Sequence, residues 1–360
     1  MGVAHSLFYS PNTDQPTPHR RTTPNQEQLD LLRKRWHDLA EFLTSYVADV
    51  TGRPVKTWIQ GSYKWASLIR PVRKGDKFDV DLGLYFLWPR GNEQFAPADL
   101  KMCVQEALFS YAGTNEQEVT GVEDPPKERC GRIHYRESFH VDVPVYHLDE
   151  AQDFRRLATQ TKGWETTDPK TIWVWFKAQL ADRDILRRVI RYLKTWAALT
   201  FNDGARPSSI MLTVLATQAY QQLGNATGNG DDEVLANVVN VIKSRLKQDR
   251  RVPNPVDRAE DLNRLQPDQF AAVLRQLEAF AERAMQAAAA QDQLTAATLW
   301  SDIFLYVFPM PDDEEVAPAG GNLPATTIVP EIGSRRRCAK RVNTSRPTAM
   351  RCRQPRRSAT

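Results

Sequence analysis

Polar and apolar residues alternate strictly over residues 78–82, Phe-Asp-Val-Asp-Leu. Successive side chains of a β-strand point to opposite faces, so a strand here places Asp79 and Asp81 on one face and the apolar residues on the other. The same alternation recurs over residues 138–145, where Asp142 stands between two valines. The pattern therefore predicts two strands, each with a buried apolar face and an acidic face.

A short apolar run over residues 55–59 predicts a further strand before the first of these two. Gly61-Ser62 interrupts the run, and residues 63–69 favour a short helix. Such a turn offers backbone N–H groups and a serine hydroxyl to a phosphate. Gly61 and Ser62 are therefore candidate phosphate-binding residues, although a Gly-Ser turn alone is a weak signal.

The acidic residues are candidate metal ligands. Two carboxylates side by side raise each other's pKa, so a fold rarely places them together without a cation between them. Carboxylate oxygens suit Mg²⁺, which completes its coordination with water and substrate phosphates. We interpret Asp79 and Asp81 as ligands and Asp142 as the third. The structural alternatives are a solvated strand face or, for Asp142, an edge strand that Pro144 would suit.

The apolar periodicity becomes continuously helical after Asp168-Pro169, a pair that is typical of a helix start. Before this point the pattern predicts one long helix, one helix behind the sheet and two further short strands. Helices are predicted over residues 24–50, 97–112, 170–180, 184–200, 210–223, 234–246, 270–291 and 294–307, and the further strands over residues 118–122 and 132–135.

This order of elements predicts an α+β fold with two lobes. We expect a mixed β-sheet palm with flanking helices over residues 23–160, braced by the long N-terminal helix. A C-terminal helical lobe is expected over residues 161–311. Residues 1–22 are polar and expected to be loose, and residues 312–360 are expected to form a disordered basic tail.

Two polar features stand out in the predicted helical lobe. Lys194 lies at the edge of the apolar stripe of the helix over residues 184–200, a position from which lysine usually extends to solvent. Ser208 and Ser209 begin the next helix, and one of them is expected to cap it. Two hydroxyls at a helix N-terminus are also suited to a phosphate.

The net charge of +4 is distributed unevenly. Residues 331–360 hold ten lysines and arginines against one acidic residue, so residues 1–330 carry a net charge of −5. The body therefore lacks the bulk positive charge of a nucleic-acid-binding protein, and a like-charged tail is usually disordered.

The four cysteines show no paired spacing, and no apolar run is long enough to span a bilayer. We therefore expect a cytoplasmic protein with no membrane partner. Cys130 with His134, His140 and His147 matches no zinc-ligand spacing, and we interpret these residues as incidental.

The ordered set of motifs resembles one family. Gln60-Gly61-Ser62-Tyr63, Ile69-Arg70-Pro71 and Asp79-Val80-Asp81 resemble the DNA polymerase beta type of nucleotidyltransferase and, within it, the bacterial cGAS/DncV-like nucleotidyltransferases (CD-NTases). Further stretches resemble that family in order: Trp164 with Asp168-Pro169, Leu193-Lys194-x-Trp196, Pro207-Ser208-Ser209, Asn254-Pro255 with Asp261-Leu262, and Trp300 through Phe308-Pro309. The resemblance covers roughly residues 25–310.

The resemblance implies two metal ions, Mg²⁺ with Mn²⁺ as a substitute, held by the three aspartates. It also implies that the Gly-Ser turn contacts the β- and γ-phosphates and that the helical lobe reaches the triphosphate. The implied catalytic and metal-binding residues are Asp79, Asp81 and Asp142, and the implied nucleotide-binding residues are Gln60, Gly61, Ser62, Lys194, Ser208 and Ser209.

The resemblance further implies NTP substrates, ATP foremost, and a cyclic di- or trinucleotide product that acts on a downstream effector in anti-phage defence. No counterpart of the zinc thumb of the animal enzyme is recognisable, so sensing of double-stranded DNA is not implied and nucleic acid is not required. The partner of the basic tail is left open.

Two alternatives remain. A linear oligonucleotide synthase or an RNA-modifying nucleotidyltransferase would share the three aspartates. A catalytically inactive RNA-binding or scaffold protein belongs to another class, and three unshielded carboxylates speak against it because a retired site does not need them.

Overall fold

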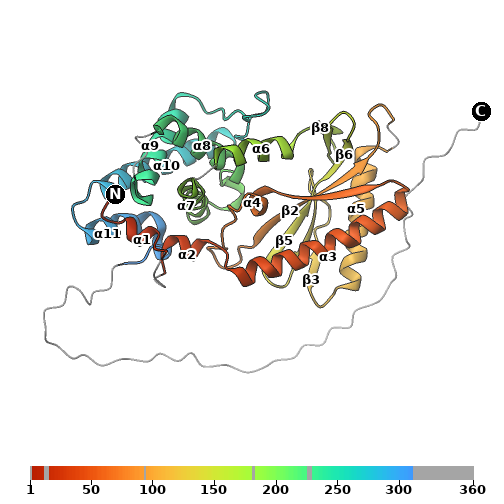
Figure 1. Ribbon diagram of the computed structural model, residues 1–360, viewed down its shortest axis with the longest axis horizontal. Helices are drawn as coiled ribbons and strands as arrows, with labels where there is room; N and C mark the ends of the chain where they lie inside the picture. Colours follow the sequence, from red (N-terminus) through yellow and green to blue (C-terminus); the bar gives the residue numbers. More distant parts are fainter. Residues whose placement is uncertain (1, 12–15, 93–94, 181–182, 225–228, 311–360) are drawn as a thin grey trace, which may run out of the picture. The chain divides into compact units, whose positions relative to one another are not determined.

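The computed structural model describes residues 2–11, 16–92, 95–180, 183–224 and 229–310 (Figure 1). These residues form a mixed β-sheet with flanking helices, followed in the chain by a group of helices, so the expected α+β class is confirmed. The strands are β1 (Val55–Gln60), β2 (Phe78–Leu87), β3 (Val119–Val122), β4 (Gly131–Tyr135), β5 (Phe139–Val143), β6 (Val145–Asp149), β7 (Phe154–Ala158) and β8 (Trp164–Thr166).

β2 is the strand around which the sheet is organised. It pairs antiparallel with β1 and parallel with both β5 and β6, and the order along the sheet is β3-β4-β5-β2-β6-β7-β8. β5 therefore lies between β4 and β2, and the edge-strand alternative for Asp142 is wrong. Pro144, which has no backbone N–H, instead separates β5 from β6, so the single strand expected over residues 138–145 is two.

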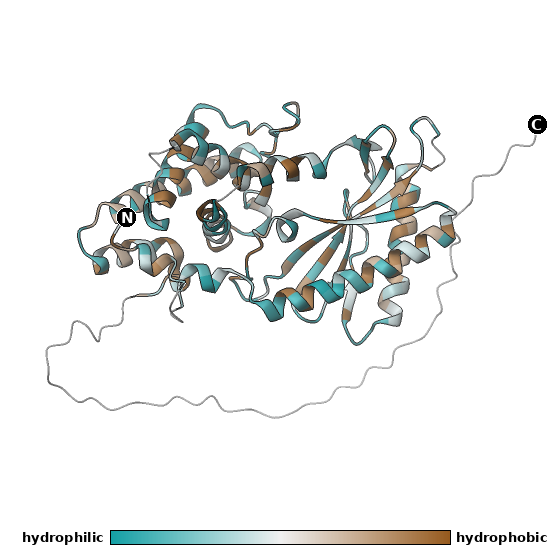
Figure 2. Ribbon diagram, viewed as in Figure 1, coloured by the Kyte–Doolittle hydropathy of each residue, from teal (hydrophilic) through white to brown (hydrophobic). Residues whose placement is uncertain are grey.

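The apolar face of β2 is buried, as the alternation predicts. Phe78 is 6% exposed, and Val80 and Leu82 are fully buried. The sheet is covered by α3 (Gln26–Thr51), which contacts β1 and β2, and by α5 (Pro97–Thr114), which contacts β3, β4, β6 and β7. Apolar and polar residues follow one another in bands along α3, as expected of a helix with one face on the sheet (Figure 2).

The helices after the sheet agree with the predicted ones to within a few residues at each end. They are α6 (Pro169–Gln179), α7 (Asp184–Thr200), α8 (Ser209–Leu223), α9 (Asp231–Gln248), α10 (Pro267–Ala288) and α11 (Gln293–Phe304). α7 lies among the others, in contact with α8, α9 and α11 (Figure 1). Its central position explains why polar side chains on it, such as Arg191 and Lys194, are buried.

The expectation of a loose N-terminus is wrong for residues 2–11 and 16–22. Two short helices form there, α1 (His5–Phe8) and α2 (Pro18–Thr22). Phe8 is fully buried, with its ring in contact with the rings of residues of α7 and α11. The buried ring of Phe8 therefore joins this polar segment to the helical core.

Two strands, β7 and β8, have no counterpart among the predictions, and β8 places sheet structure beyond the palm boundary expected at residue 160. The predicted basic tail, residues 312–360, lies outside the described residues. None of the described helices combines the length and apolarity that a membrane crossing requires.

Candidate active site

The two acidic strands are direct neighbours. In the parallel pairing of β2 with β5, Asp81 is in register with Asp142, and Asp79 is in register with His140. Residues in register on adjacent strands project to the same face of a sheet. The prediction that Asp79, Asp81 and Asp142 share one face is therefore confirmed, and His140 joins them.

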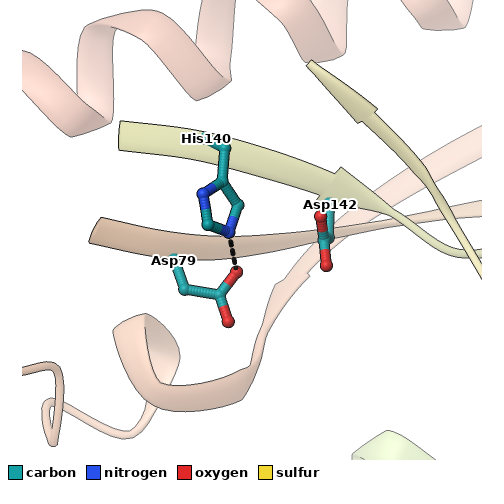
Figure 3. A group of neighbouring side chains, drawn as sticks. All are labelled: Asp79, His140 and Asp142. Carbon is teal, nitrogen blue, oxygen red and sulfur yellow. Dashed lines mark hydrogen bonds and ion pairs between the residues drawn. The ribbon is translucent and has the colours of Figure 1, made fainter. Parts of the chain in front are cut away.

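Asp79, His140 and Asp142 approach one another closely (Figure 3). One potential ligand atom from each lies within 4.8 Å of the others, and His140 Nε2 is 2.9 Å from Asp79 Oδ1. Burial acts to raise the pKa of Asp79, but the hydrogen bond with His140 and the charge of Arg132 hold that pKa below its usual range. The interpretation of His140 as incidental is wrong, because it contacts the acidic group directly.

Arg132 binds both oxygens of Asp142. These two residues are opposite each other in the antiparallel pairing of β4 with β5. Arg132 donates from Nε to Oδ1 and from Nη2 to Oδ2, the latter over 2.7 Å. Burial opposes the charge of Arg132, but the hydrogen bonds and charge of Asp142 and the charge of Asp79 hold its pKa above the usual range. Arg132 is therefore permanently charged, and its charge lies next to the acidic residues.

Gly61 and Asp81 are in close contact. Gly61 has φ of +63°, and a Cβ atom there would lie 1.8 Å from Asp81 Oδ2. Only glycine satisfies both the left-handed backbone and this approach. Burial and the charges of Asp79 and Asp142 raise the pKa of Asp81 well above its usual value. Asp81 is thus the carboxylate whose charge is least compensated.

A cleft of about 520 Å³ opens beside this face of the sheet. Four predicted site residues line it, from segments far apart in the sequence: Ser62, Asp79, Lys194 and Ser209. Arg132 and His140, which were not among the predicted site residues, line it as well. The cleft therefore joins the acidic face of the sheet to the helices that follow it.

Lys194 points into the protein rather than to solvent, so the expectation from its stripe-edge position is wrong. It is 4% exposed, and its Nζ donates to the backbone oxygen of Ser67 over 3.1 Å and to the Ser67 hydroxyl over 3.0 Å. Burial and the charge of Arg191 lower the pKa of Lys194 to about 7. The helix that carries Lys194 is thereby tied to the segment that follows the Gly-Ser turn.

Ser208 and Ser209 have different roles. The Ser208 hydroxyl accepts a hydrogen bond from Met211 N over 3.3 Å and caps α8, which confirms that one of the two serines is the cap. Ser209 lines the cleft. Of the two predicted phosphate contacts, Ser209 is the one whose position suits the role.

Gln60 is not among the residues that line the cleft, and neither are Gly61, Asp81, Asp142 and Ser208. The role of Gln60 as a nucleotide contact stays a prediction. It is 6% exposed, its amide nitrogen donates to the Tyr146 hydroxyl over 3.0 Å, and its amide oxygen accepts from the Tyr85 hydroxyl over 3.3 Å. Both ends of the amide are therefore engaged behind the turn. The structure gives Gln60 a supporting role for the end of β1.

Comparison with known proteins finds a family match for the part of the chain that carries the acidic strands. Residues 55–146 match the family described as "Cyclic GMP-AMP synthase DncV-like, nucleotidyltransferase domain", a stretch that includes both acidic strands. Residues 55–146 are therefore similar to a DncV-like nucleotidyltransferase domain. This result confirms the resemblance drawn from the ordered motifs.

One relative of this chain is the cyclic GMP-AMP synthase of Escherichia albertii, 27% identical over 331 residues, which cover 91% of this chain and 72% of the relative. The c-di-GMP synthase of Roseivirga ehrenbergii is 23% identical, with 66% of this chain and 69% of the relative covered. The fold matches a structure of Vibrio cholerae DncV cyclic AMP-GMP synthase in complex with the linear intermediate 5' pppA(3',5')pG, with a TM-score of 0.71. The two sequences are 18% identical, and the match covers 86% of this chain and 97% of that chain.

The donor set of the acidic face fits a divalent cation. Three carboxylates share one face, and Asp81 is destabilised by the charges of the other two, a strain that a bound cation would relieve. Oxygen donors suit Mg²⁺ or Mn²⁺, and a histidine nitrogen beside them is compatible with Mn²⁺. The residues present therefore fit the metal that the family implies.

The sequence interpretation missed three residues of the site: Arg132, His140 and Ser67. A signal for Arg132 was present, because Gly131 to Tyr135 alternates as the acidic strands do. Alternation alone does not reveal which strand is the neighbour. No local pattern marks Ser67, whose role arises from contact with Lys194.

Proposed function

We propose that this chain joins NTPs into a cyclic di- or trinucleotide and releases pyrophosphate. The observation that carries the proposal is the cleft, where the acidic face of β2 and β5 meets Lys194 and Ser209 of the following helices. The names of the relatives, cyclic GMP-AMP synthase and c-di-GMP synthase, support a cyclic dinucleotide. These names differ in the bases joined, so the bases are to be found by experiment.

Asp79, Asp81 and Asp142 are proposed to hold two Mg²⁺ ions, for which Mn²⁺ is a substitute. When bound, such ions lower the pKa of an attacking hydroxyl and neutralise charge on the leaving pyrophosphate. Asp142 is the residue proposed to accept the proton of the attacking ribose hydroxyl. Its carboxylate must be free of Arg132 to do so, because that guanidinium engages both oxygens.

The phosphates are proposed to lie between the Gly-Ser turn and the helices. Ser62 offers its hydroxyl from one side of the cleft, and Ser209 from the other. Lys194 is at the cleft with its Nζ on Ser67, and a triphosphate would favour its charged form. These groups orient the substrate, and the linear intermediate is proposed to rebind in the same cleft for ring closure.

In the cell, the product is proposed to act as a second messenger on a downstream effector in anti-phage defence, with synthesis in the cytoplasm. The body charge of −5 on residues 1–330 favours this function over that of an RNA-modifying nucleotidyltransferase. Nucleic acid is not a required partner in this proposal.

The direct test is to incubate the purified protein with all four labelled NTPs and Mg²⁺, treat the mixture with phosphatase, and resolve the products by chromatography and mass spectrometry. A phosphatase-resistant product with the mass of a ring is expected. A ladder that phosphatase degrades would replace the cyclase with a linear synthase. Absence of any product with either Mg²⁺ or Mn²⁺ would contradict the proposed activity of the isolated protein.

A further inference from the structure

The Arg132–Asp142 pair occupies the position of a metal ligand. Asp142 has two carboxylate oxygens, and Arg132 binds both of them in a bidentate contact. Both side chains are largely enclosed, with 18% of Arg132 and 13% of Asp142 exposed. A divalent cation needs at least one of these oxygens. In the arrangement seen here, metal and guanidinium therefore compete for the same carboxylate.

The guanidinium also lies between two acidic partners. Arg132 Nη2 is 3.9 Å from Asp79 Oδ1, so the charge of Arg132 acts on two of the three aspartates. Without such a cation, three neighbouring carboxylates would repel one another. Arg132 thus supplies positive charge to two of the three aspartates from within the protein.

Glu123 offers a second carboxylate near the guanidinium of Arg132. Glu123 Oε2 lies 3.9 Å from Arg132 Nε, and the Glu123 side chain is 37% exposed. Lys127 and His134 lie within 4 Å of the same carboxylate, so Glu123 already serves as an anion for nearby basic groups. A small movement would transfer Arg132 from Asp142 to Glu123.

We propose that Arg132 is a displaceable internal counter-ion: it holds Asp142 in the metal-free protein, and metal binding transfers it to Glu123. The inference rests on the proposed metal-binding role of the three aspartates and adds a positioning residue to it. Its consequence is that metal affinity depends partly on how strongly Arg132 competes with the metal for Asp142. Removal of Arg132 should therefore tighten metal binding, whereas a group that merely orients Asp142 would weaken it when removed.

The test measures Mn²⁺ binding to the nucleotide-free protein by electron paramagnetic resonance of free Mn²⁺. Arg132→Met is expected to bind Mn²⁺ about tenfold more tightly than wild type. Arg206→Met is the matched control, because Arg206 lines the same cleft but pairs with Asp203 at 2.9 Å. Its Mn²⁺ affinity should stay within about twofold of wild type. Unchanged or weaker binding by Arg132→Met overturns the inference.

Glu123→Gln separates displacement from a general charge effect. It is expected to weaken Mn²⁺ binding severalfold in the wild-type background, because Arg132 loses its second position. In the Arg132→Met background the same change should have almost no effect. Equal effects of Glu123→Gln in both backgrounds would mean that the charges act independently, and would contradict a transfer of Arg132.

Two further measurements keep the outcome decisive. Arg132→Lys retains the charge but loses the bidentate contact, so its Mn²⁺ affinity should fall between those of wild type and Arg132→Met. Thermal melting shows whether each variant is folded. If no variant, Arg132→Met included, binds Mn²⁺ with or without an NTP, the metal assignment itself fails and this inference fails with it. If all variants bind Mn²⁺ with equal affinity, the counter-ion role of Arg132 is refuted and the metal assignment is not.

Discussion

Gly61 is the residue at which backbone conformation and chemistry are most tightly linked. Its positive φ turns the chain from β1 into α4 (Gly61–Lys64), and its missing side chain leaves room for the carboxylate of Asp81. The Gly-Ser turn was predicted as a phosphate contact. The structure adds a second reason for the glycine, since any Cβ would push Asp81 out of place.

Gly61→Ala is therefore expected to abolish turnover and to cost about 1–2 kcal/mol of unfolding free energy from the left-handed backbone alone. Gly52→Ala is the matched control: Gly52 has φ of +66°, and a Cβ there would meet nothing within 4 Å. This variant should lose similar stability but keep full turnover. Loss of turnover in both, or in neither, would contradict the role given to the Asp81 contact.

Lys194 should make stability depend on pH. Its pKa is about 7 in the folded protein, against 10.5 as the usual value. Between these values the unfolded chain binds more protons, so stability rises with pH, and the charged lysine destabilises the fold fully below about pH 7. Lys194→Met should therefore be more stable relative to wild type near pH 6 than near pH 10. A melting-temperature difference that does not change with pH would contradict a buried, depressed lysine.

The residues of the acidic face could be predicted because alternation fixes which side chains share a face of a strand. Arg132 and His140 could not be assigned, because their roles depend on the register of β4 with β5 and of β5 with β2. The burial of Lys194 could not be predicted for the same kind of reason. A stripe edge faces solvent only when no neighbouring element covers it, and here the segment around Ser67 does.

At the scale of elements, α7 holds residues 66–68, the segment that follows the Gly-Ser turn at the cleft. Arg191 is buried and donates to the backbone oxygens of Ala66 and Leu68, while Lys194 binds Ser67 between them. Ala66 has φ of +50°, a conformation that is costly for alanine and needs such support. One turn of α7 thus fixes three consecutive residues beside the cleft.

Arg191→Met should lower the free energy of unfolding by about 2–4 kcal/mol, because it leaves two backbone oxygens without their donor. It should also reduce turnover by disturbing Ser67. Arg187→Met on the same helix is the control, since Arg187 forms a local ion pair with the exposed Asp184. Its effect on stability should stay within about 0.5 kcal/mol. Chemical denaturation of both variants measures these values, and equal effects would contradict the support given by Arg191.

The helices could be predicted almost to their ends, because apolar periodicity and the start signals of α3 and α6 are local features. The strands were predicted less completely. β7 and β8 are short and carry arginine, glutamate and threonine, so they lack the apolar alternation that marks β2 and β5. β7 pairs with β6 and β8 pairs with β7, and these pairings, rather than an apolar pattern, define both strands.

At the scale of the whole molecule, the first described residues complete the core of the helices that follow the sheet. The ring of Phe8 contacts the rings of Tyr192, Trp300 and Phe308. Nearby, the backbone nitrogen of Ala4 donates to Asp232 over 3.1 Å. The N-terminal segment is thus part of the folded unit. Its polar composition gives no indication that Phe8 belongs to the core.

Phe8→Ala should lower the free energy of unfolding by about 3–5 kcal/mol, because it removes a fully buried ring from an aromatic cluster. Phe109→Ala removes the same side chain from a position that is 46% exposed and should cost much less. Denaturant titration of the two variants gives the comparison. Similar losses would contradict the structural role of the N-terminal segment.

The central claim is that the carboxylates on β2 and β5 are the catalytic machinery. Its most direct test is NTP turnover by the double variant Asp79→Asn, Asp81→Asn beside Asp203→Asn, which changes an exposed carboxylate at the same cleft. We predict that the double variant loses turnover by about a thousandfold or more and that thermal melting shows it to be folded. Asp203→Asn should remain active. Wild-type turnover by a folded double variant of equal purity would contradict the account.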